Sequence, residues 1–327
     1  MFMDKLSFRM KYNMYEKRFV YLFSIIFFAV FLYINFISRI WQVSPLVYLV
    51  FVFVVISWTV YLLIRSIMLT SGYVSVHQKE DLYFGDFITI CLLYYTTQYL
   101  VSWSVYFIAG LLAPKLILNN IISNIENLEN LVTPISTFCS FFVAALVLLI
   151  LPKLFAEKLI KSKGLFGFGF LLGEGSQLYK SFIYGLSVAT VIVILNFLYF
   201  NYQLPFSNLS QISSMAYGPL YSQILCAVLV VLIVPVTEEY LFRGIILSEL
   251  TKRIGIKWGI IISVLLFLIY HFTEKISFIS IFGLIALSSI TTYYRTITGC
   301  LGPSIVFHMS YNFTLLLSIF IVVYTSS

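Results

Sequence analysis

The sequence predicts an all-α fold, a polytopic transmembrane helical bundle of about eight or nine spans. Of the 327 residues, 61% are hydrophobic and only 10% are charged, whereas soluble domains carry about 25% charged residues. The mean hydropathy is +1.00, and the apolar residues gather in runs of about 20, the length that crosses the hydrocarbon core of a bilayer. These observations exclude a soluble globular domain, a disordered chain and a fibrous repeat.

Nine apolar runs are candidate spans. In chain order they are Phe19–Ile37, Pro45–Ile64, Phe87–Ala113, Leu131–Leu151, Ser181–Phe200, Pro219–Val236, Ile256–His271, Ile276–Tyr293 and Pro303–Tyr324. The first run is expected to be a retained helix, because more runs follow it and it lacks the cleavage site of a signal peptide. Two alternatives stay open: the sixth run ends at Val236 or continues through the charged segment after it, and one of the short seventh and eighth runs is re-entrant or tilted.

The basic residues predict the orientation. If alternate loops face opposite sides, 17 of the 20 lysines and arginines share the side of the N-terminus, and basic loops are typical of the cytoplasmic face. A cytoplasmic N-terminus follows, with the C-terminus outside for nine spans and inside for eight. The basic residues that give the net charge of +7 lie between apolar runs. A lipid bilayer is therefore expected as partner, and nucleic acid is not.

The cysteines and the glycine-rich loop do not indicate a disulfide, a zinc site or a phosphate-binding site. Cys91, Cys139, Cys226 and Cys300 lie far apart in apolar stretches without a CxxC pair, which indicates buried thiols and not disulfides or zinc ligands. The glycine-rich segment Lys153–Lys180 lacks the spacing of a phosphate-binding loop. The sequence also shows no internal repeat, which disfavours a transporter.

A charged cluster interrupts the apolar C-terminal third. Glu238 and Glu239 follow one apolar run, and Arg243 precedes the next. Glu239 and Arg243 are four residues apart with the acid first, the favourable order for an ion pair on a helix. Glu238 is rotated by about 100° from Glu239 and lacks that partner. The pattern predicts a structural Glu239–Arg243 pair and a chemically active Glu238, against the alternative of charges at a membrane edge.

Two of the three histidines lie in the same third of the chain. His77 is in a polar loop, whereas His271 ends an apolar run and His308 lies in the last one, with Asn312 one turn later on the same helical face. Buried apart, these polar groups would each cost a few kcal/mol. We therefore expect them to converge with Glu238 around water.

These residues resemble a known family. Glu238-Glu239-xxx-Arg243-Gly244, then Phe267-xxx-His271 preceded by Ser263, then His308-xxx-Asn312 are similar to the three motifs of the CAAX protease and bacteriocin-processing (CPBP, Abi) family of intramembrane proteases, which includes the type II CAAX prenyl endopeptidase. All three stand in order within about Pro219–Phe313.

The resemblance implies a role for each residue. Glu238 and His271 would activate a water, and His308 and Asn312 would form an oxyanion hole; Glu239, Arg243 and Phe267 would support the site. It divides the chain into N-terminal helices with a cytoplasmic tail and glycine-rich loop (1–180) and a catalytic membrane domain (181–327). The implied activity is that of an endopeptidase acting on a peptide or protein that enters from the membrane or cytoplasm.

Two further alternatives concern the metal and the function. Two histidines and a glutamate are also zinc ligands, but there is no HExxH, so metal-free chemistry is favoured and zinc is the alternative. The residue usage, rich in Ile, Phe and Tyr, favours a bacterial plasma membrane, where the family implies maturing or clearing a bacteriocin leader, a signal peptide or a CAAX-like substrate. The alternative function is a non-proteolytic self-immunity or scaffold protein.

One expectation conflicts with straight, full-length spans. His271 would lie near the outer end of the seventh span, while Glu238 and His308 would lie near the inner ends of the sixth and ninth. The residues can meet only if the Glu238 segment dips back into the bilayer, or if the seventh helix is re-entrant or begins earlier, around 248–254.

Overall fold

The computed structural model describes residues 84–118, 125–160, 172–199, 215–271 and 278–326, and every regular element in these segments is helical. The helices are α3 (Phe84–Leu118), α4 (Ile125–Ile160), α5 (Gly175–Tyr199), α7 (Leu220–Val228), η1 (Leu229–Ile233), α8 (Val234–Glu239), η2 (Tyr240–Ile246), α9 (Leu247–Ile254), α10 (Ile256–His271), α11 (Phe278–Thr298) and α12 (Gly302–Ser326). The all-α fold is therefore confirmed.

Five helices in the described part of the chain are long and apolar enough to cross a membrane, with spans at Leu128–Ile150, Gly175–Tyr199, Leu220–Ile254, Phe278–Thr298 and Gly302–Val322. The predicted spans at 19–37 and 45–64 lie outside the described residues. Large apolar side chains such as Phe107, Leu198 and Trp258 remain exposed on the bundle, as expected of surfaces that face lipid. The total of eight or nine spans stays a prediction.

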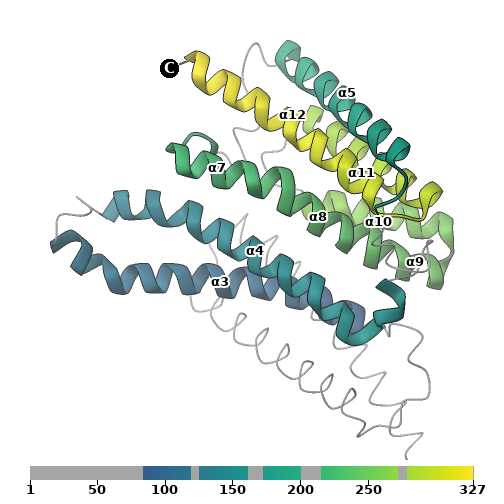
Figure 1. Ribbon diagram of the computed structural model, residues 1–327, viewed down its shortest axis with the longest axis horizontal. Coiled ribbons are helices and arrows are strands. Elements are labelled where there is room, and N and C mark those ends of the chain that lie inside the picture. Colours follow the sequence, from purple (N-terminus) through teal and green to yellow (C-terminus); the bar gives the residue numbers. More distant parts are fainter. Residues whose placement is uncertain (1–83, 119–124, 161–171, 200–214, 272–277, 327) are drawn as a thin grey trace, which may run out of the picture.

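The helices form layers around one long central helix (Figure 1). The hairpin of α3 and α4 lies on one side of the segment from α7 to α9, and α12 with α5 lies on the other. A buried core joins Tyr94 of α3 and Leu148 of α4 to Phe242 of η2, Phe267 of α10 and Phe307 of α12. Packing thus brings helices from both halves of the chain to the charged cluster.

The central helix is longer than its apolar run. It continues from Leu220 to Ile254, and a helix of 35 residues spans about 52 Å, well beyond a hydrocarbon core of about 30 Å. Of the two alternatives for the sixth span, continuation through the charged segment is correct. Glu238 consequently lies in the middle of a long helix.

A tight turn at Gly255 sends the chain back along this helix. Gly255 has φ +81°, a conformation that favours glycine because it has no Cβ, and α10 begins at the next residue. Glu238 precedes the turn by 17 residues and His271 follows it by 16. The two residues therefore lie at about the same distance from the turn along the two arms of the hairpin. The seventh helix begins at Ile256 as predicted, and the extension of the sixth helix removes the expected conflict.

The contact between α5 and α12 depends on a small residue. A Cβ added to Gly185 would lie 1.9 Å from Ser310 Oγ and 2.5 Å from the carbonyl oxygen of Phe307. Small residues let transmembrane backbones approach closely. This approach seats the first turns of α12, which carry His308, against the bundle.

Candidate active site

Three predicted residues from three helices converge inside the bundle. Nε2 of His271 lies 3.5 Å from Glu238 Oε2, and Nε2 of His308 lies 3.9 Å from the same oxygen. The Glu238 and His308 side chains are 5% and 2% exposed, while that of His271 is 25% exposed. One carboxylate oxygen therefore faces two imidazole rings, and the His271 side is the more open of the two.

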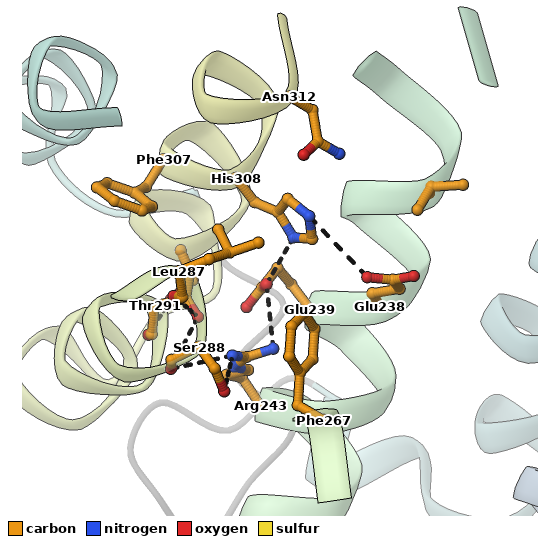
Figure 2. Close-up of polar contacts among 12 residues, drawn as sticks. Glu238, Glu239, Arg243, Phe267, Leu287, Ser288, Thr291, Phe307, His308 and Asn312 are labelled. Atoms are coloured by element: carbon orange, nitrogen blue, oxygen red, sulfur yellow. Dashed lines mark hydrogen bonds and ion pairs between the residues drawn. The ribbon is translucent and has the colours of Figure 1, made fainter. Parts of the chain in front are cut away.

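Glu239 supports this arrangement from the other side of His308 (Figure 2). Its Oε1 accepts a hydrogen bond of 2.8 Å from His308 Nδ1 and lies 3.2 Å from Arg243 Nη1. The Glu239–Arg243 pair expected from the spacing is present. The contact with His308 was not expected, because the spacing predicted a pair between Glu239 and Arg243 alone.

The guanidinium of Arg243 is held by a neighbouring helix and an aromatic ring. Nη2 donates to the hydroxyl of Ser288 at 2.9 Å and to its carbonyl at 3.0 Å. Cζ lies 4.4 Å from the ring centroid of Phe267, within the range of a cation–π contact. The Phe267 ring also lies against His271, with ring centroids 4.3 Å apart.

The hydrogen bonds assign the proton of each histidine. Nδ1 of His271 lies 2.9 Å from the carbonyl oxygen of Phe267, and Nδ1 of His308 faces a carboxylate that is paired with Arg243. Both Nδ1 atoms must therefore donate, and in the neutral rings both Nε2 atoms present lone pairs toward Glu238. His308 can donate from Nε2 only when the ring carries both protons.

The same orientation bears on a metal. Histidines that bind zinc often donate a hydrogen bond from the other ring nitrogen to a carboxylate or carbonyl. Glu239 accepts such a hydrogen bond from His308, although it was expected to pair with Arg243 alone. Across the described ranges, however, no group of three or more His, Cys, Asp or Glu side chains has an arrangement that could hold a metal ion. Among these side chains, His308 and Glu239 share a hydrogen bond and Glu239 and Arg243 an ion pair.

Asn312 lies one turn beyond His308 on α12 (Figure 2), and its amide has a structural contact. Nδ2 donates to the carbonyl oxygen of Val230 at 3.0 Å. Val230 lies in the π-helical turn η1, five residues before Pro235, which has no N–H to donate back along the helix. Asn312 thus supplies a hydrogen bond that Pro235 cannot make.

Side chains of α10 and α11 also bind the backbone of η2. Nε of Arg295 donates to the carbonyl of Arg243 at 3.2 Å, and Ser263 Oγ donates to the carbonyl of Phe242 at 3.3 Å. Arg243 and Arg295 were among the 17 basic residues that the predicted orientation assigned to loops, but both are fully buried within helices. Arg295 lies two residues beyond the predicted run Ile276–Tyr293, so hydrophobicity alone did not place it within the helix.

A comparison with known proteins found a family that matches the part of the chain that holds this site. Residues 220–314 match the family described as type II CAAX prenyl endopeptidase Rce1-like, a segment that holds all four predicted catalytic residues and less than a third of the chain. Neither the curated proteins nor the solved structures gave a match. The match supports a CAAX-type intramembrane endopeptidase in general. It confirms that this segment of the chain is similar to the CAAX protease family.

Proposed function

We propose that this protein is an intramembrane endopeptidase that hydrolyses a peptide bond with water activated by Glu238 and His271. The observation that carries the proposal is the convergence of the two Nε2 atoms on Glu238 Oε2, at 3.5 and 3.9 Å. A water between Glu238 and His271 would lie within hydrogen-bond reach of both, as a general base requires. The more exposed edge of His271 is the side from which water and substrate would enter.

The proposed reaction needs only groups of this chain. Glu238 takes a proton from water while the water oxygen attacks the scissile carbonyl carbon. His308, in its doubly protonated form, and the remaining N–H of Asn312 donate to the oxyanion that forms; one such donor contributes about 3–4 kcal/mol. The proton on Glu238 then passes to the leaving nitrogen, the C–N bond breaks, and a carboxylic acid and an amine are released.

The proposed substrate is a peptide or protein segment that reaches the site from the membrane or the cytoplasm. We place the protein in the plasma membrane of a bacterium with a cytoplasmic N-terminus, where the activity would mature or clear a bacteriocin leader, a signal peptide or a CAAX-like substrate. Most basic residues lie between apolar runs of the sequence, as in the loops of membrane proteins, so the proposed partner is a lipid bilayer and not a nucleic acid.

The test is cleavage by the purified, full-length protein reconstituted in liposomes. Two probes are offered, an internally quenched farnesylated CAAX peptide and a degenerate peptide mixture, with products identified by mass spectrometry. Cleavage at defined bonds supports the proposal. Absence of cleavage of both probes, by protein whose fold is intact, would favour the alternative of a non-proteolytic immunity or scaffold protein.

Asn312→Ala is expected to lower kcat by about 100- to 1,000-fold, as loss of an oxyanion-hole donor does. Because Asn312 also binds the Val230 carbonyl, thermal stability should fall as well, so kcat is measured on protein confirmed to be folded. Ser318→Ala is the control, since Ser318 lies on the same helix and its hydroxyl donates to the nearby Leu315 carbonyl. An unchanged kcat in Asn312→Ala would assign Asn312 to helix packing alone.

Activity is expected to survive removal of metal ions. If Glu238 and His271 act on water directly, dialysis against a strong chelator should leave kcat within about twofold, because no step passes through a metal. Metal content is measured in parallel by elemental analysis. Stoichiometric zinc, with activity lost on its removal and restored on its return, would make His308 a ligand and not an oxyanion donor.

A further inference from the structure

A tyrosine outside the family-matched segment lies beside the site. Tyr94 is on α3 and is 1% exposed, in the same core as Phe242 and Phe267. Its hydroxyl is next to the side chains of Thr237 and Gln98 and within electrostatic reach of Glu238. A row of rings connects it to the site: Tyr94 to Tyr95, Tyr95 to Tyr270 and Tyr270 to His271, with centroids 5.3, 5.7 and 4.9 Å apart.

The polar atoms here lack hydrogen bonds. In the described part of the structure, Tyr94 Oη, Gln98 Nε2 and Glu238 Oε2 are buried and have no partner at hydrogen-bond geometry. Leaving a buried polar group unsatisfied costs about 1–3 kcal/mol, and buried polar groups are rarely unsatisfied in native proteins. Two donors and one acceptor on facing helices therefore point to a molecule that binds between them.

We propose that α3 supplies a peptide-binding subsite, in which the Tyr94 hydroxyl, assisted by the Gln98 amide, donates a hydrogen bond to a backbone carbonyl of the substrate next to the scissile bond. This inference rests on the proposed endopeptidase function and extends it to a helix that the family match does not cover. A peptide carbonyl suits these groups because both offer N–H or O–H donors without a charge. Glu238 Oε2 stays available for the attacking water.

The spacing on α3 supports a single contact surface. Tyr94 and Gln98 are four residues apart and lie on the same face of the helix, and α3 contacts η2. A peptide lying between α3 and α8 would thus place one carbonyl against Tyr94 and the next bond against Glu238. The helix outside the matched segment would contribute to substrate binding, while the matched helices contribute the chemistry.

The test is Tyr94→Phe, which removes the hydroxyl and keeps the ring. With the peptide of the degenerate mixture that the wild type cleaves fastest, kcat/KM is expected to fall about tenfold, the effect of one lost hydrogen bond to a substrate. In the Glu238→Gln background, the dissociation constant of the same peptide should rise by a similar factor. Tyr106→Phe is the matched control, because Tyr106 is on the same helix, 43% exposed and bonded to Thr133.

A second measurement separates binding from packing. The second measurement uses a series of peptides in which each backbone carbonyl is replaced in turn by a methylene. The peptide that lacks the carbonyl bound by Tyr94 should bind wild type and Tyr94→Phe equally, because in a double-mutant cycle the second change has no effect once the interaction is gone. Unchanged kcat/KM and dissociation constant in Tyr94→Phe, with an active wild type, would overturn the subsite and leave the proposed function standing. A wild type that cleaves neither probe would overturn both, and a loss in Tyr94→Phe that is the same for every peptide would assign Tyr94 to packing.

Discussion

Glu238→Gln is expected to lower kcat by about 100- to 10,000-fold, the range attributed to general acid–base groups. The amide has nearly the shape of the carboxylate but cannot take a proton from water. The neighbours of the Glu238 carboxylate are two histidine Nε2 atoms, whereas Arg243 is paired with Glu239, so the fold should tolerate the change. The measurement is kcat in liposomes beside the melting temperature of the same preparation.

The matched control for this variant is Glu249→Gln. Glu249 is on the same long helix and is 3% exposed, but it pairs with Lys252 and Arg253 away from the two histidines. Its kcat should stay within about twofold of the wild type. Full activity in Glu238→Gln, on a substrate that the wild type cleaves, would falsify the glutamate mechanism.

Glu239→Gln is expected to lower the free energy of unfolding by about 3–5 kcal/mol, the cost of leaving a buried charge without its partner. Glu239 is fully buried and pairs with both Arg243 and His308, so the substitution leaves a buried guanidinium uncompensated. The measurement is reversible unfolding in mild detergent. Glu249→Gln again serves as control, with a loss of about 1 kcal/mol or less, because its partners are 20% and 38% exposed and exposed ion pairs contribute little.

A double variant separates the charge from the shape. Replacing both partners, as Glu239→Gln with Arg243→Met, should recover part of the lost stability, because no buried charge remains unpaired. It should not recover activity, since His308 would still lack the carboxylate that orients it. A double variant as unstable as the sum of the single changes would mean that the ion pair is not the source of the effect.

Local spacing determined much of the candidate site. The four-residue separation of Glu239 and Arg243 predicted their ion pair, and the pair is present. The limits of α10, Ile256–His271, were predicted from an apolar run. These predictions concern residues within one helix, where the helical repeat sets the distance between side chains.

Hydrophobicity alone could not predict the length of the central helix. Its apolar run ends near Val236, yet the helix continues to Ile254, because Arg243 is bound by Ser288 and Phe267 on other helices. A charged residue ends a span when water must solvate it. Here the neighbouring helices supply its partners, and a pattern along one segment contains no information about them.

Contacts between helices were decided only by the tertiary structure. His308 contacts Glu239 across 69 residues of sequence, Asn312 donates to Val230 across 82, and Tyr94 of α3 reaches the surroundings of Glu238. The sequence indicated that these polar groups must be satisfied, since burial without partners is costly. Which atom satisfies which depends on how the hairpin at Gly255 and the close approach at Gly185 set the helices against one another, and that geometry exists only once the helices pack.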